Sequence, residues 1–308
     1  MYSPLPSAEP APVLRVDPSP PRAVDHAQRP RPPAPDPLPI PVVDNHCHLD
    51  LSRDDDEPPP DLVRVLAEAA AVGVPRMVQI GCDLAGARFT VDAVDRYAAL
   101  LGGVAIHPNE APRLAARGEL VEALGEIERF ASHERIRVVG ETGLDYFRTG
   151  ADGIAAQQDS FRWHIDVAKR LGLALQIHDR DAHADVLRIL AEEGAPERTV
   201  LHCYSGDLGM ARECVERGYF LSFAGTVTFK NARGLRDALA VTPLDHLLVE
   251  TDAPYLAPTP HRGATNAPYL VPLTVRFMAG VLAVAVPTLC AALAGNTERV
   301  YGSWERSG

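Results

Sequence analysis

The sequence predicts an α/β protein folded as a (β/α)8 TIM barrel, and three observations support this fold class. From Val42 onward, short apolar runs of strand character alternate with amphipathic stretches of helical spacing. Eight such units occupy roughly 265 residues, which is the size typical of this barrel. Histidines and carboxylates follow several of the runs, where barrels of this class place their active sites. A doubly wound open sheet is the second choice, but no G-x-G-x-x-G follows the first strand.

Each strand is predicted from a run of four or five mainly apolar residues, and each helix from apolar residues at helical spacing. The predicted strands span residues 42–46, 76–80, 103–106, 136–140, 173–177, 199–202, 219–223 and 246–250. The predicted helices span residues 61–72, 84–100, 120–133, 156–171, 182–193, 208–217 and 232–240.

Two segments fall outside this alternation. Residues 1–39 carry close to half of the 28 prolines and show no apolar periodicity, so we expect a disordered leader before a barrel domain of residues 40–308. The acidic, proline-rich stretch 54–60 directly follows the first strand. We expect it to form a solvated loop beside the site.

Composition restricts the class of protein. The chain has 308 residues, and its net charge of −11 argues against a broad basic surface that grips duplex DNA. A polyanionic substrate would need local positive charge from arginines or bound metal. Five scattered cysteines without a C-x-x-C motif argue against a disulfide framework or a zinc ribbon. With no signal-peptide pattern and no apolar run of about 20 residues, we expect a cytoplasmic protein without a membrane partner.

The segment His46-Cys47-His48 is the first candidate for metal binding. Residues two apart on a strand point the same way and lie about 6 to 7 Å apart, so both imidazoles face one side and Cys47 faces the other. Such a pair also arises by chance, and it becomes informative only together with the other strand ends.

Those other strand ends carry further imidazoles and carboxylates. They supply His107, Glu141, Asp145, His178, His202, Glu250 and Asp252. Histidines on four separate strands are hard to reconcile with purely structural roles. Neutral imidazoles and carboxylates together suit Zn, Mn or Fe, or Mg where fewer histidines take part.

Glu141 lies centrally among the strands, so we expect it to bridge two divalent ions about 3.5 to 4 Å apart. The remaining ligands then divide into two groups: His46, His48 and Asp252 for one ion, and His178 and His202 for the other. Nucleophilic catalysis is disfavoured because there is no G-x-S-x-G motif. Cys47 and Cys203 are expected to point away from the site.

Several segments resemble the TatD-related metal-dependent deoxyribonucleases of the amidohydrolase superfamily. The matching segments are 44–50, 106–108, 140–146, 176–182, 201–206, 250–256 and 262–263. The resemblance implies a distorted TIM barrel that hydrolyses DNA phosphodiesters, commonly as a 3′ to 5′ exonuclease on single strands. It assigns metal binding to the same six residues, and it gives Asp252 the proton of the attacking water. Tyr204 stands where the family often has phenylalanine.

Substrate contacts are predicted less directly. Arg180, Lys230 and Arg262 are candidates for phosphate contacts, and His107 and Tyr204 for other substrate contacts. The aromatic residues near the rim, which could stack on unpaired bases, are Tyr146, Phe147, Tyr204 and Tyr255. The expected partner is single-stranded DNA; a monomer is favoured, although the sequence leaves the oligomeric state open.

The sequence leaves two other functions of the barrel open. One keeps the metal but changes the bond to an amide, ester or lactone, including the removal of a D-aminoacyl group from tRNA. A bridging lysine would point to carbamate-bridged hydrolases, and the chain has Glu141 instead. The other reading is a non-catalytic module that binds nucleic acid or protein, and the complete ligand set argues against it.

Overall fold

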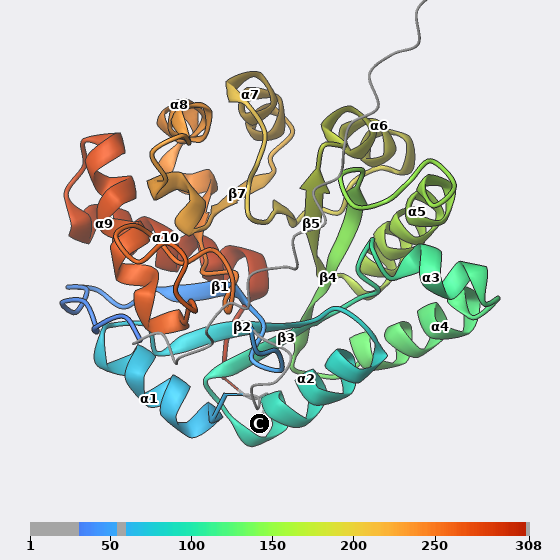
Figure 1. Ribbon diagram of the computed structural model, residues 1–308, viewed down its shortest axis with the longest axis horizontal. Helices are drawn as coiled ribbons and strands as arrows, with labels where there is room; N and C mark the ends of the chain where they lie inside the picture. Colours follow the sequence, from blue (N-terminus) through green and yellow to red (C-terminus); the bar gives the residue numbers. More distant parts are fainter. Residues whose placement is uncertain (1–30, 54–59, 306–308) are drawn as a thin grey trace, which may run out of the picture. The chain divides into compact units, whose positions relative to one another are not determined.

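A computed structural model describes residues 31–53 and 60–305. Predictions for residues 1–30 of the leader and 54–59 of the acidic loop therefore lie outside the described residues. Eight parallel strands form one sheet in sequential order (Figure 1). They are β1 (Val43–Cys47), β2 (Arg76–Gly81), β3 (Leu100–Val104), β4 (Ile136–Asp145), β5 (Ala174–Arg180), β6 (Thr199–Leu201), β7 (Phe220–Phe223) and β8 (Leu247–Val249). Sequential order confirms the predicted barrel, because a doubly wound sheet reverses its strand order.

The sheet is nearly closed by the segment that follows β8. The Asp252 amide donates to the His46 carbonyl at 3.0 Å, and the His48 amide donates to the Ala253 carbonyl at 2.8 Å. A side-chain bond from Asn45 Nδ2 to the Val249 carbonyl, 2.8 Å long, ties β1 to β8. These bonds bring Asp252 next to the two histidines of the first strand.

Helices pack around the outside of the strands (Figure 1). They are α1 (Leu62–Ala71), α2 (Leu84–Arg96), α3 (Ala111–Ala116), α4 (Leu120–Ala131), α5 (Ile154–Leu171), α6 (His183–Glu193), α7 (Leu208–Glu216), α8 (Arg233–Val241), α9 (Val271–Leu282) and α10 (Val286–Tyr301). The predicted helix 84–100 is too long, because Leu100 and Leu101 are buried residues of β3. Our prediction did not include α3, α9 or α10.

Alternate strand residues belong to two apolar clusters. Met77 of β2 packs in the cluster that includes the helices, whereas its neighbour Val78 joins a second cluster with Leu101, Val138 and Leu248. That second cluster also contains Tyr301 and residues near the end of the chain. Apolar side chains therefore fill the barrel, and the polar residues collect at the carboxyl ends of the strands.

The described part of the predicted leader packs against the barrel. The Leu38 amide donates to the Val72 carbonyl at 3.0 Å, and the Tyr269 hydroxyl donates to the Pro32 carbonyl at 2.7 Å. Arg31 forms an ion pair with Glu68. The compact unit thus starts at Arg31, before the boundary that we placed at residue 39.

Among the described residues, no single helix is long and apolar enough to cross a membrane. One pair of helical segments, 268–282 and 286–301, passes the length and composition test only when taken together, and it is bent by 112°.

Candidate metal centre

His46 and His48 face each other at the end of β1, with their Nε2 atoms 3.2 Å apart. His46 Nδ1 donates to Gln176 Oε1 at 2.7 Å, and His48 Nδ1 donates to the Ile80 carbonyl at 2.9 Å. The Gln176 amide is oriented by its Nε2, which donates to the Asn45 carbonyl. Because each Nδ1 carries a proton, each neutral ring presents a lone pair at Nε2. Two facing lone pairs are an arrangement that a bound cation would satisfy.

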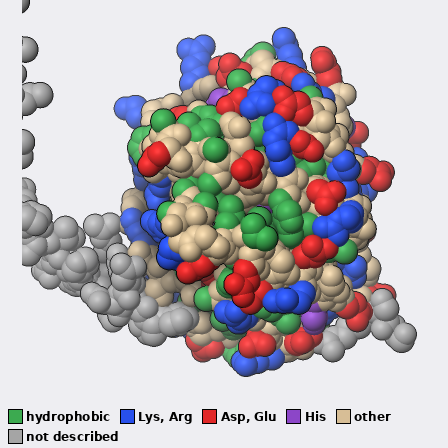
Figure 2. All heavy atoms as spheres, turned by 90° about the vertical axis from the view of Figure 1, so that its right-hand side faces the viewer, with side chains coloured by type: hydrophobic (Ala, Val, Ile, Leu, Met, Phe, Trp, Pro, Cys, Tyr) green, Lys and Arg blue, Asp and Glu red, His purple; other side chains and the backbone are tan. Residues whose placement is uncertain are grey.

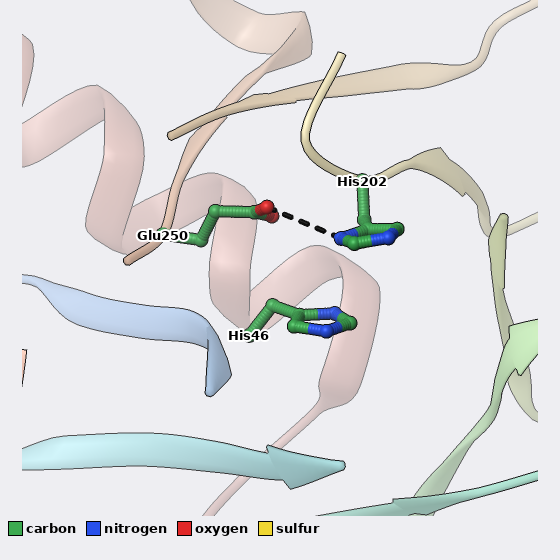
Figure 3. Close-up of side chains that lie close together, drawn as sticks. All are labelled: His46, His202 and Glu250. Atoms are coloured by element: carbon green, nitrogen blue, oxygen red, sulfur yellow. Dashed lines mark hydrogen bonds and ion pairs between the residues drawn. The ribbon is translucent and has the colours of Figure 1, made fainter. Parts of the chain in front are cut away.

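His202 follows β6, and its ring stacks on that of His46 with centroids 3.9 Å apart (Figure 3). Its Nδ1 lies 3.2 Å from Glu250 Oε1, and its Nε2 lies 3.1 Å from Glu141 Oε1. Glu250 is buried and also accepts from the Cys203 amide at 2.7 Å and the Ser222 hydroxyl at 2.5 Å. Glu250 therefore orients His202 from behind and turns its Nε2 toward the centre.

Glu141 occupies the middle of the cluster and is only 4% exposed. The nitrogens nearest its two oxygens are His178 Nδ1 at 2.8 Å, His202 Nε2 at 3.1 Å, His107 Nε2 at 3.2 Å, His46 Nε2 at 3.3 Å and His48 Nε2 at 3.6 Å. Burial alone would raise the pKa of Glu141, but the surrounding imidazoles outweigh burial and hold it well below its ordinary value. One carboxylate thus contacts both groups of predicted ligands, as a bridging role requires.

His178 lies near the end of β5 between two carboxylates. Its Nδ1 contacts Glu141, and its Nε2 lies 3.2 Å from Asp145 Oδ2. Burial would lower the pKa of His178, but Asp145 and Glu141 raise it above its ordinary value. Close approach of β4 and β5 depends on Gly143, which has φ of 131° and whose added Cβ would lie 2.1 Å from the His178 carbonyl oxygen.

Asp252 completes the side of the centre nearest β1. Its Oδ1 lies 3.4 Å from His48 Nε2 and 3.8 Å from His46 Nε2. Its φ of 55° departs from strand geometry, so strand alternation does not apply to it. Burial would raise the pKa of Asp252, but His48 and His46 lower it below its ordinary value. Its carboxylate is therefore ionised at neutral pH.

The donor atoms fit divalent metal ions. Ligand atoms within 4.8 Å of one another form four groups: His46, His202 and Glu250; His46, His48 and Asp252; His48, Cys82 and Glu141; and His107, Glu141 and His178. Imidazole nitrogens and carboxylate oxygens at this spacing are the ligands that Zn, Mn and Fe prefer. The fit rests on the Nε2 atoms of His46 and His48, which face each other 3.2 Å apart while each Nδ1 is bonded on the other side of its ring.

His107 differs from the other histidines. Its Nδ1 accepts a hydrogen bond from the Asn109 amide at 3.0 Å, so in the neutral ring the proton resides on Nε2. That Nε2 lies 3.2 Å from Glu141. Burial lowers the pKa of His107 and keeps the ring neutral. The ring is therefore set up as a hydrogen-bond donor at the site.

Two residues around the centre were not among the predicted site residues. Cys82 follows β2, and its Sγ lies 3.5 Å from Glu141 Oε2. Gln176, two residues before His178, orients His46. Cys82 belongs to no recognisable motif, and Gln176 lies in the segment 176–182 that resembles the family; only their position at or near a strand end could have suggested a role at the site.

We expected two cysteines to point away from the site, and strand alternation holds for Cys47 but does not apply to Cys203. Cys47 is buried and donates to the Val78 carbonyl, as expected. Cys203 lies beyond the end of β6 with φ of 41°, so strand alternation does not apply to it. Burial, together with nearby Asp252 and Glu250, raises the pKa of its thiol well above the ordinary value.

Of the predicted substrate contacts, Arg180 is the last residue of β5, Lys230 lies beyond the end of β7, and Arg262 lies beyond the end of β8. The Arg180 guanidinium lies 4.0 Å from the centre of the Phe147 ring, and that of Arg262 lies 4.5 Å from the Phe229 ring. Arg262 and Lys230 are exposed. Tyr204 is only 2% exposed and its hydroxyl donates to the Asp207 carbonyl, so the structure does not present its ring to a substrate.

Arginines on the outer helices are used differently. Figure 2 views the side that lies at the right of Figure 1, and it shows acidic and basic side chains interspersed there. On these helices, Arg162 pairs with Glu192 and Glu193, and Arg188 pairs with Asp185. By contrast, within the described part of the chain, Arg180 and Arg262 form no ion pair with a carboxylate, which leaves both available to an anion.

A nearly closed parallel barrel with buried histidines and carboxylates at its strand ends defines a metal-dependent hydrolase of the amidohydrolase fold. Residues 43–302 match the family model described as TatD related DNase. The chain belongs to this family.

Relatives and a solved structure agree with that assignment. The chain is 45% identical to the uncharacterized metal-dependent hydrolase TatD of Mycobacterium tuberculosis, over 86% of this chain and 99% of the relative. It is 38% identical to the uncharacterized metal-dependent hydrolase YcfH of Escherichia coli, over 84% and 95%. The crystal structure of YJJV, a TatD homolog from Escherichia coli, matches with a TM-score of 0.77 at 26% identity, over 85% of this chain and 98% of that one.

Proposed function

We propose that this hydrolase cleaves phosphodiester bonds of DNA and acts as a 3′ to 5′ exonuclease on single strands. One observation carries the proposal most: Arg180 and Arg262, which form no ion pair with a carboxylate among the described residues, lie at the carboxyl end of the barrel, in a chain whose net charge is −11. Positive charge placed there, beside a histidine and carboxylate centre, suits a substrate with several phosphates. The description of the family as DNases supports the same substrate.

We assign two divalent ions, Mg, Mn or Zn, to this centre. His46, His48 and Asp252 would hold one ion, His178 and His202 would hold the other, and Glu141 would be a ligand common to both. When bound, such ions lower the pKa of a water molecule and neutralise charge that develops on phosphoryl oxygens.

Two protein groups act directly on the reacting atoms in this proposal. Asp252 accepts the proton of the attacking water, because its carboxylate is ionised and its side chain is 15% exposed beside His48. His107 donates a hydrogen bond from its Nε2–H to a phosphoryl oxygen. The ring proton lies on Nε2 because Nδ1 accepts from the Asn109 amide. Arg180, Arg262 and Lys230 contact neighbouring phosphates.

A substrate panel tests the proposal. Metal-stripped protein reloaded with Mg, Mn or Zn is assayed on single-stranded DNA labelled at the 3′ or the 5′ end, beside a carboxylic ester and D-aminoacyl-tRNA. We expect mononucleotides released from the 3′ end and little turnover of the other two substrates. Hydrolysis of the ester or the aminoacyl-tRNA, with no DNA cleavage under any metal, would replace the proposal with an acyl hydrolase.

A further inference from the structure

Phe147 is an exposed aromatic ring close to the metal centre. It lies two residues beyond Asp145, whose Oδ2 is 3.2 Å from His178 Nε2. The residue is 63% exposed, although exposing an apolar phenylalanine ring to water is unfavourable. Single exposed apolar residues are common on protein surfaces, so the position of this ring matters more than its exposure.

Arg180 packs against the Phe147 ring, and the pairing of β4 with β5 brings the two residues together. Asp145 pairs with Arg180 in the register of β4 and β5, and the Tyr146 amide donates to the Arg180 carbonyl at 2.9 Å. The Arg180 guanidinium then lies 4.0 Å from the centre of the Phe147 ring. An arginine stacked on an aromatic ring keeps its donors at its edge, where they can reach a phosphate.

The other three aromatic residues that we predicted near the rim are less suited to receive a base. Tyr204 is buried, and the Tyr146 hydroxyl is engaged by Asp185 at 2.7 Å. Tyr255 is 42% exposed, and its ring lies 6.5 Å from that of His48. Phe147 combines the greatest exposure of these four rings with a cation on its face.

Resting on the proposed function, we infer that Phe147, backed by Arg180, stacks on an unpaired base of the substrate strand beside the scissile phosphate. Every base has an aromatic face, so this contact favours single strands without favouring a sequence. Paired bases are already stacked in a duplex, and a duplex end would have to open before it could use this contact.

Kinetics on matched strands test the inference. The substrates are a short oligothymidylate and the same strand with abasic residues near its 3′ end. For Phe147→Ala and Phe147→Leu we expect kcat/KM on the intact strand to fall about tenfold, mostly through KM, with a change below about twofold on the abasic strand. Leucine keeps the apolar volume but lacks the aromatic face. Val121→Ala, which removes another exposed apolar side chain on the outer helix α4, should change neither value.

A binding measurement detects stacking without turnover. In an Asp252→Asn background, the fluorescence of Phe147→Trp should be quenched by the oligothymidylate and not by the abasic strand, beyond any change seen with Phe147 in place. A strand that binds by anisotropy without quenching the tryptophan would overturn the inference, as would equal kinetic losses on both strands. Failure of the unmodified enzyme to cleave either strand would count against the proposed hydrolysis instead.

Discussion

Each imidazole at this centre is held by a partner that determines which nitrogen faces inward. Gln176 is the partner of His46, and it is buried in a network with the Asn45 carbonyl and the Tyr301 hydroxyl. Glu250 is the corresponding partner of His202, because its Oε1 lies 3.2 Å from His202 Nδ1. Outer partners of this kind fix the tautomer and raise the basicity of the ligand nitrogen.

Loss of the Gln176 acceptor should weaken metal binding. We expect Gln176→Leu to lower the affinity for Zn or Mn by about 10- to 100-fold, because His46 is then free to rotate or to change tautomer. Gln176→Glu keeps an acceptor and should retain more of the affinity. Titration calorimetry on metal-stripped protein measures the change, and equal affinities in all three proteins would contradict the assigned role.

Glu141 and Asp252 should be separable by metal content. Glu141→Gln should lose most bound metal and all measurable activity, because the amide replaces one of the two carboxylate oxygens with an NH2 group and removes the negative charge that both groups of ligands surround. Asp252→Asn should retain the ion held by His178 and His202 while losing activity. Metal analysis of dialysed protein and circular dichroism, which reports on the fold, check both expectations. Full activity in either variant would contradict its role.

At the scale of elements, β4 and β5 approach so closely at Gly143 that only glycine fits. We expect Gly143→Ala to destabilise the protein by about 1 to 3 kcal/mol, because φ of 131° is strained for alanine and the new Cβ would meet the His178 carbonyl. Urea denaturation measures the loss. Gly234→Ala, a position with open space in α8, provides the control and should not destabilise.

A second contact between elements makes stability depend on pH. His164 of α5 is buried: its Nε2 accepts from the Ile106 amide at 3.2 Å, and its Nδ1 donates to the Ser160 carbonyl at 2.7 Å. Burial lowers the pKa of His164 from 6.5 to about 4. A second ring proton would face the Ile106 amide, so the folded state resists protonation.

The sign of this effect follows from the depressed pKa. On acidification the unfolded chain takes up the proton before the folded protein does. The free energy of unfolding therefore keeps its full value above pH 6.5 and falls by about 3 kcal/mol as the pH drops toward 4. His164→Gln should be less stable at pH 7 but should lose less stability on acidification. Urea denaturation at pH 7 and pH 4.5 compares them, with His261→Gln as control. Parallel pH dependence in wild type and His164→Gln would contradict this account.

Elements were predictable where their pattern is periodic and local. Eight strands and seven helices follow from apolar spacing, and the strand-end rule brought together His46, Glu141 and Asp252 from distant parts of the chain. The length of β4 was not predictable, because Leu144 is the one apolar residue among Glu141 to Asp145 and the other four are polar or glycine. Nor was the burial of Tyr204, which packs against Phe223 from another strand.

At the scale of the whole molecule, the distribution of charge matters more than its sum. If Arg180 and Arg262 each contact a phosphate, kcat/KM on single-stranded DNA should fall about sevenfold between 50 and 200 mM salt, as expected for about two contacts. Arg262→Ala should make this dependence shallower. Arg188→Ala on α6, whose arginine is paired with Asp185, should leave it unchanged. Identical salt dependence of kcat/KM in the wild type, Arg262→Ala and Arg188→Ala would argue against phosphate contacts at the carboxyl end of the barrel.

The central claim is that two divalent ions, joined by Glu141, act on a DNA phosphodiester. Its most direct test measures bound metal and 3′-end release from single-stranded DNA in one series, as Mn or Zn is titrated into metal-stripped protein. We predict that activity rises as occupancy approaches two ions per chain, and that Glu141→Gln neither binds two ions nor cleaves DNA. Full activity at one ion per chain, or two bound ions without any DNA cleavage, would contradict it.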